Sequence, residues 1–285
     1  MLRNNIFDLN SYIEARISYA RVLEKLHTRQ AGEKLIKLLK KALIMRPDEP
    51  HVNVSLRSLL GLMFRLKSDD ETYKFMRQYI SALAVKYRPL NERPRDYNKM
   101  NALNDLEVIR RTPSSLILHV AFVILKLRVI AQLQDIPKVA GTKDRIVPKE
   151  LKDEAHFGFL NAITTTEDDR CIIREAGYER LLVRLNEQVR MLILDVHRCN
   201  QQTWEYLMAK EVPANMFESQ ENSNSHIFIR MQLREPFEKT PGAVRFVEGF
   251  FVENQIPTSL EIKNEPNQWE DISLYDISME QDDSD

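Results

Sequence analysis

Glycine is scarce in this chain, with only seven glycines among 285 residues. Sheets and phosphate-binding loops use glycine for tight turns and for close backbone approach, so its scarcity argues against both. Most of the twelve prolines fall between segments of periodic apolar residues. Because 43% of the residues are hydrophobic, a chain of this length can bury a sizeable core. This composition predicts long helices joined by short connections.

Cysteine is also scarce, since Cys171 and Cys199 are the only two. Two thiols in so long a chain do not make a disulfide framework, which indicates a reducing compartment. A secretory signal peptide is not expected either, because Asp8 and Glu14 stand where its apolar region would lie. We therefore expect a cytoplasmic or nuclear location, or both.

Motifs that carry chemistry are missing as well. The sequence contains no glycine-rich phosphate loop, no nucleophile elbow and no pair of histidines at the spacing of a metal-binding helix. His197 and Cys199 are two residues apart and so face different sides of a helix. We predict no catalytic residue, no cofactor and no metal. An enzyme whose site is assembled from distant residues stays an open alternative.

A long and mostly apolar run is what the chain does have, from Ser114 to Leu133, and it carries His119, Lys126 and Arg128. A helix that is apolar on all sides must be covered by other helices or by lipid. A membrane span usually needs about twenty apolar residues without charge. We therefore predict a buried core helix and no membrane, with the two cations at the rim and His119 as a core histidine.

The first ninety residues predict four amphipathic helices in two helix–turn–helix units. Their apolar residues recur three and four apart over residues 11–27, 31–45, 50–63 and 68–80. Pro50 opens the third helix, and Ser68 with Glu71 forms a capping box for the fourth. The units lie roughly forty residues apart, which is the period range of helical repeats. The predicted fold class is all-α, with such pairs packed on a bundle around the core helix.

A long helix over residues 168–207 carries a seam typical of coiled coils. The seam consists of Leu182, Leu185, Val189, Leu192, Val196 and Cys199. It packs inside the chain or against a second copy, so the protein is a monomer or a homodimer through the helix from Leu182 to Cys199. We favour internal packing, because the seam is short for an independent coiled coil.

The connecting segments and the end of the chain give weaker patterns. We expect short helices over 102–110 and 148–162, an exposed connection over 87–100 and a loop over 136–146. Residues 225–234 alternate as a strand would, and the choice between strand and helix stays open. Thr240 and Pro241 predict the cap and first turn of another helix.

Charge is distributed unevenly along the chain. No basic residue follows Lys263, and eight acidic residues do. We predict a helical domain over 1–255 and an acidic, disordered tail over 256–285. Lys34, Lys37 and Lys41 form one basic stripe on the second helix. This stripe is either a solvated outer face or a docking surface for an acidic segment, from a partner or from the chain's own tail.

Three stretches together resemble a largely fungal family of helical proteins described as tetratricopeptide-like, some of which carry a MYND-type zinc finger. They are residues 56–79, 119–133 and 238–251, and the resemblance covers residues 11–251. It implies a helical interaction scaffold and no activity. The finger is absent here, because two distant cysteines cannot supply its ligands. Arg57 and Met76 stand where small residues are usual, so no peptide-clamp residue is carried over.

The expected function is therefore a non-catalytic intracellular scaffold that binds a protein or peptide, with an acidic segment as the favoured partner. The alternative is a nucleic-acid-associated or transcription-related regulator that uses the mildly basic helical body. Salt dependence separates the two, because phosphate-driven binding weakens steeply as salt rises.

Overall fold

The computed structural model describes residues 2–26, 28–45, 50–67, 69–87, 106–111, 116–140, 177–209 and 225–256. These residues form helices and turns and contain no strand, which confirms the all-α prediction. The helices are α1 Leu2–Glu24, α2 Arg29–Met45, α3 Pro50–Leu66, α4 Asp69–Tyr87, α5 Leu106–Arg111, α6 Leu116–Ala140, α9 Gly177–Cys199, α10 Gln202–Met208, α11 Ser225–Glu238 and α12 Ala243–Glu253.

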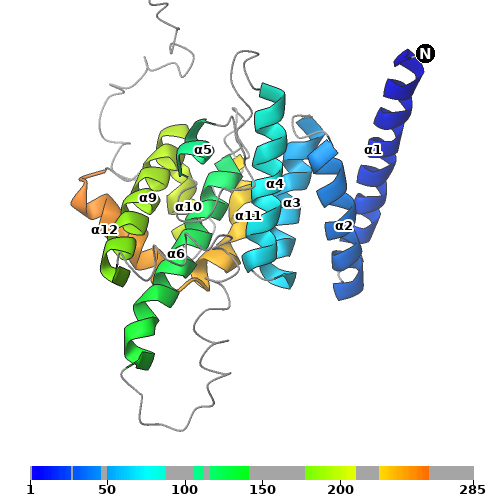
Figure 1. Ribbon diagram of the computed structural model, residues 1–285. Helices are drawn as coiled ribbons and strands as arrows, with labels where there is room; N and C mark the ends of the chain where they lie inside the picture. The colour runs from blue at the N-terminus through cyan, green and yellow to red at the C-terminus, as the bar shows by residue number, and fades with distance from the viewer. Residues whose placement is uncertain are drawn as a thin grey trace, which may run out of the picture.

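The helices pack side by side, and α6 lies against α4, α9 and α11 (Figure 1). Helix α9 packs most extensively on α6, and α11 and α4 also contact it. Helices α1 to α4 extend the molecule to the other side, where α1 packs on α2, α2 on α3 and α4, and α3 on α11. One continuous apolar cluster joins side chains from α1 through α12. The described helices therefore share one hydrophobic core. This core includes the contact between α3 and α11, which are far apart in the sequence.

Helix α2 shows why the first helices form an outer layer. Most of its apolar residues recur three and four apart and are buried, whereas Lys34, Lys37 and Lys41 are exposed on the other side. The buried set is Ala31, Gly32, Leu35, Ile36, Leu39, Ala42 and Leu43. The Thr28 hydroxyl accepts a hydrogen bond from the Ala31 amide at 3.2 Å, so a side chain caps the start of the helix. Helix α2 thus contacts α1, α3 and α4 and leaves one face to solvent.

Helix α6 is the buried core helix that the apolar run predicts. All its residues from Val120 to Leu127 are buried, and the apolar residues beyond them continue the same core. Among the described helices, only the stretch Leu116–Gln134 is long and apolar enough to cross a membrane, and 72% of it is buried inside the protein. Neighbouring helices cover it, as in a core helix. The helix continues through Pro137 to Ala140, so the prediction of a loop over 136–146 is wrong for residues 136–140, and residues 141–146 lie outside the described part of the chain.

The prediction that both cations of α6 lie at its rim is wrong for Lys126. Its side chain is only 1% exposed, and its Nζ donates to Gln188 Oε1 of α9 at 2.8 Å. Arg128 is only partly buried. Its guanidinium donates to Thr240 Oγ1 and to the Pro236 carbonyl and pairs with Asp69. The buried part of α6 therefore contains a charged group, the Lys126 ammonium. The core tolerates this charge because a polar side chain of α9 accepts a hydrogen bond from it.

The predicted seam lies on α9 and packs internally. Leu185, Val189, Leu192 and Val196 are fully buried in the core that contains α6. Cys199 at its end is exposed. The single helix expected over 168–207 is interrupted, since α9 ends at Cys199 and α10 begins at Gln202. The Asn200 side chain accepts from the Gln202 amide at 3.1 Å, a local bond that competes with helix continuation.

Residues 225–234 are helical, so the strand-like alternation is misleading. Ile229, Leu233 and Phe237 lie four residues apart on one face of α11 and are buried, whereas Met231 is 68% exposed. A strand would place Met231 with Ile229 and Leu233 on the same face. The apolar alternation therefore combines a buried helical face with one exposed methionine.

The prediction that Thr240 and Pro241 start the last helix is shifted by two residues. Thr240 is buried, and its hydroxyl donates back to the Pro236 carbonyl of α11 at 2.7 Å. Gly242, with a φ of 71°, makes the turn into α12 in the left-handed region that favours glycine. Tyr87, where the exposed connection expected over 87–100 begins, is the last residue of α4. Ser68 of the capping box, the rest of that connection, the segment expected over 148–162 and the tail from 257 onward lie outside the described residues.

Candidate functional site

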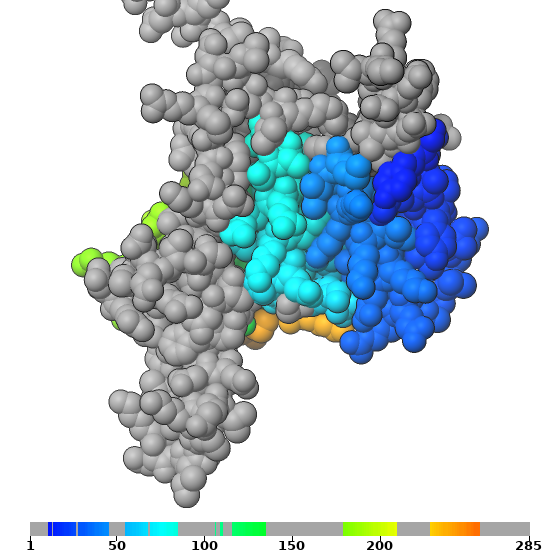
Figure 2. Space-filling view, turned by 45° about the vertical axis from the view of Figure 1, so that its right-hand side comes forward, coloured from blue at the N-terminus to red at the C-terminus, as the bar shows by residue number. Residues whose placement is uncertain are grey.

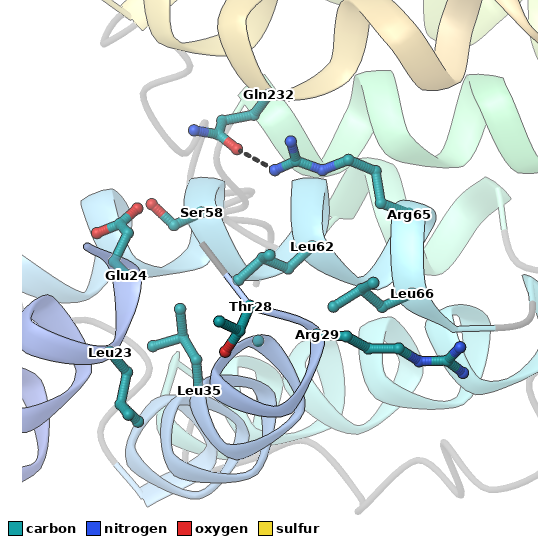
Figure 3. A pocket seen from close by; sticks show the side chains of 11 residues that line it. Leu23, Glu24, Thr28, Arg29, Leu35, Ser58, Leu62, Arg65, Leu66 and Gln232 are labelled. Carbon is teal, nitrogen blue, oxygen red and sulfur yellow. Dashed lines mark hydrogen bonds between the residues drawn. The ribbon is translucent and has the colours of Figure 1, made fainter. Parts of the chain in front are cut away.

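A groove of about 450 Å³ opens between the α1–α2 turn, α3 and α11. Figure 3 shows side chains from all of these elements converging on it. Its lining residues are Leu23, Glu24, Thr28, Arg29, Gly32, Leu35, Ser58, Leu62, Arg65, Leu66 and Gln232. The floor is made of leucines and the edges are polar. Such a combination suits a segment that buries apolar side chains and keeps its charges at the edge.

Gly32 of α2 brings the floor of the groove close together. A Cβ at this position would lie 2.7 Å from the Leu66 Cδ1 of α3, which is closer than side-chain atoms approach. Leu23 and Leu35 are buried beside it, and Leu62 and Leu66 are half-buried. The half-buried leucines keep apolar surface accessible within the groove. A partner's side chain can therefore gain hydrophobic contact here.

The opposite wall forms where α11 crosses α3. A Cβ on Gly61 would lie 2.4 Å from Gln232 Oε1 and 3.0 Å from the Gln232 backbone oxygen. Only glycine at position 61 permits this approach, which holds Gln232 over the groove. In Figure 3, Gln232 reaches from α11 toward Arg65 of α3. Residues 167 positions apart thus meet at one edge.

The charge at the edge of the groove is mainly cationic. The Arg65 Nε donates to the Gly61 carbonyl at 3.1 Å, and its Nη2 donates to Gln232 Oε1 at 3.4 Å. Both acceptors are neutral, and no described carboxylate lies within ion-pair distance of Arg65, although its charge adds to Lys239 in lowering the pKa of Glu235. Arg29 is exposed and has a long 3.4 Å ion pair with Glu33. Glu24 is the one acid that lines the groove. Arg65 can therefore still accept a carboxylate from a partner.

The predicted lysines Lys34, Lys37 and Lys41 are all exposed, and no described acid forms an ion pair with any of them. On the surface in Figure 2, α2 lies between α1 and α4. The lysines face away from Gly32 and Leu35, which line the groove. The three lysines of the stripe are therefore exposed, whereas the residues of α2 that line the groove, Gly32 and Leu35, are buried.

Lys40 is the fourth lysine of this helix and has a different environment. Its Nζ lies 5.7 Å from the centre of the Phe75 ring of α4. Burial lowers the pKa of Lys40, and Lys67 lowers it further, whereas Glu71 raises it. Lys40 therefore belongs to the α2–α4 contact, and the stripe consists of the other three lysines.

His197 and Cys199, the histidine and cysteine closest together in the sequence, lie in separate environments. Burial lowers the pKa of His197, and its ring packs edge-on against Phe251 with 5.2 Å between centroids. Cys199 is exposed, but partial desolvation at the end of α9 and the Asp195 carboxylate raise the pKa of its thiol, which favours the protonated, weakly nucleophilic form. The described residues contain no group of three or more His, Cys, Asp or Glu side chains arranged for a metal ion. His119 is half-buried in α6.

Sequence reasoning missed the groove, although two glycines mark it. Gly32 and Gly61 lie inside helices, where glycine costs about 1 kcal/mol relative to alanine. Such a residue in a chain poor in glycine indicates close helix approach. Nothing in the sequence of α3 or of α11 alone predicts that these two helices pack against each other. No family model, curated protein or solved structure matches this chain.

Proposed function

We propose that this chain is a non-catalytic protein–protein interaction scaffold inside the cell, and that its groove holds an apolar segment with acidic flanks from a partner. The observation that carries the proposal is Arg65, an exposed cation at the edge of a leucine-lined groove whose hydrogen bonds go to neutral oxygens. A partner carboxylate would replace a neutral acceptor with an ionised one and form an ion pair.

The build of the groove supports this proposal. Its volume lies within the range of small binding sites, and its walls come from four elements of the packed core. A rigid site reduces the entropy lost on binding. The resemblance to tetratricopeptide-like proteins implies the same kind of role. The lysine stripe on α2 is a second surface for an acidic partner, separate from the groove.

The test is an affinity purification of the tagged full chain at near-physiological salt, with quantitative comparison of three proteins. They are the parent, Arg65→Glu in the groove, and the triple variant Lys34→Glu, Lys37→Glu, Lys41→Glu on the stripe. We expect partners that depend on Arg65 and persist with the stripe variant. Partners lost only with the stripe variant would move the site to the outer face of α2. An absence of specific partners for the parent would overturn the proposal.

A nucleic-acid-associated role is the alternative, and the exposed lysines of α2 favour it. Binding driven by phosphate releases counterions, so its affinity falls steeply with salt. A labelled duplex and a labelled single strand, titrated with the full chain at low and near-physiological salt, test this role. Binding that weakens steeply between the two salt concentrations and disappears with the stripe variant would favour the regulator over the scaffold.

A further inference from the structure

We propose that the groove is occupied in the free protein by the chain's own acidic tail, through the segment from Gln268 to Asp276. This proposal rests on the proposed function, because it needs the groove to bind peptides. It names the first ligand of that site and makes the tail a competitor of outside partners.

The chemistry of the segment matches the groove. Trp269, Ile272, Leu274 and Tyr275 supply apolar side chains for the leucine floor, and Glu270 and Asp271 stand directly beside Trp269. The groove offers half-buried leucines and the Arg65 guanidinium, whose hydrogen bonds go to the neutral Gly61 and Gln232 oxygens. A large apolar side chain can pack on the leucine floor, and an acidic residue beside it can pair with Arg65.

The tether is long enough for this contact. The described chain ends at Ile256, just beyond α12, and α12 packs on α11, which carries Gln232. Helix α12 has 11 residues and so spans about 16 Å, and the part of α11 beyond Gln232 adds about 9 Å. About a dozen residues separate Ile256 from Trp269, and such a stretch extends to roughly 40 Å. The segment can therefore return from α12 to the groove without any change in the helices.

Tethering makes even a weak contact effective. A short flexible tether gives an effective concentration on the order of 1 mM. A segment with a dissociation constant of about 0.1 mM would then fill the groove in most molecules and weaken an outside competitor about tenfold. The contact should also weaken as salt rises, because the ion pair with Arg65 lies at the surface.

The test uses full-length proteins and, as the probe, a fluorescent peptide of residues 264–285, with binding followed by anisotropy. The tail variant Trp269→Ala, Ile272→Ala removes the internal competitor and leaves every described residue unchanged. We expect this variant to bind the probe about tenfold more tightly than the parent. Adding Arg65→Glu to the tail variant should abolish the gain, whereas adding the matched control Lys37→Glu, on the outer face of α2, should not. Thermal unfolding of each variant checks that it is folded.

Three outcomes would overturn the proposal. Equal binding by the parent and the tail variant, with dependence on Arg65, would show a peptide groove that the tail does not occupy, and the proposed function would stand. Loss of binding with Lys37→Glu and not with Arg65→Glu would place the tail on the lysine stripe. No binding of the probe to the tail variant, while the purification recovers partners that depend on Arg65, would remove the tail and keep the groove.

Discussion

Lysine occupies two opposite environments in this protein. Lys34, Lys37 and Lys41 of α2 are exposed, whereas Lys126 of α6 is 1% exposed and bonded to Gln188. Helix α2 is apolar on one side only, so its lysines fall on the face that no helix covers. Helix α6 is apolar all round, so any charge within it must enter the core. The distribution of apolar residues around each helix therefore decides whether a lysine on it is exposed or buried.

The outer helices and the core helices also differ in how much apolar surface and charge they leave open. The outer helices α1 to α3 leave apolar surface open in a groove with a cationic edge. The core helices close their surface and pair their charges internally, as Arg128 does with Asp69. Burial raises the pKa of Asp69 even though Arg128 lowers it, which indicates how strongly this node is desolvated. We therefore propose that binding uses the outer region, whereas the core region keeps its charges paired inside the protein.

The largest expected effect comes from breaking the buried polar pair. Gln188→Leu removes an acceptor from a buried ammonium group and should lower the free energy of unfolding by about 1.5–3 kcal/mol. In a Lys126→Met background the same change should cost much less, because the charge that needs the acceptor is gone. Urea unfolding of the parent, both single variants and the double variant measures the coupling.

The matched control for this cycle is Lys37→Met on the exposed face of α2. Its effect on the free energy of unfolding should stay within about 0.5 kcal/mol, because its ammonium group keeps its water in the folded state. If Gln188→Leu costs the same with and without Lys126, the two side chains are not coupled. The hydrogen bond to Gln188 would then not be what stabilises Lys126 inside α6.

A smaller effect should follow from filling the α3–α11 contact. Gly61→Ala puts a Cβ 3.0 Å from the backbone oxygen of Gln232, so the two helices must move apart, at about 1–3 kcal/mol. Gly249→Ala in α12 is the matched control. Nothing lies within 4 Å of its Cβ position, and it should raise stability by about 0.5–1 kcal/mol. Thermal unfolding compares the two, and changes of equal sign would contradict the close approach.

Sequence patterns predicted the elements better than their partners. The burial of α6 and the internal seam of α9 follow from the apolar patterns, because each helix carries its own apolar face. The groove does not follow, since it depends on α11 crossing α3 beside Gly61. The strand-like pattern misled because Met231 is apolar and exposed. The position of Lys126 was missed because its acceptor lies 62 residues away in sequence.

The smallest effect is a dependence on pH at the junction of α9 and α12. Burial lowers the pKa of His197 below its ordinary value of 6.5, despite a backbone hydrogen bond at Gln201 and the charge of Glu205, which raise it. The unfolded chain then binds more protons than the folded chain, so the stability that depends on neutral His197 is complete above about pH 6.5 and falls as the pH drops through the lowered pKa.

His197→Phe keeps an aromatic ring against Phe251 and removes the titration. Between about pH 7.5 and about pH 5.5 the parent should lose up to about 0.5 kcal/mol more stability than the variant, a small value because the ring is partly exposed and screened by solvent. Proton NMR of the imidazole ring gives the midpoint directly, and it should lie below 6.5. A midpoint above 6.5 would mean that Glu205 outweighs burial, and acid would then stabilise this junction.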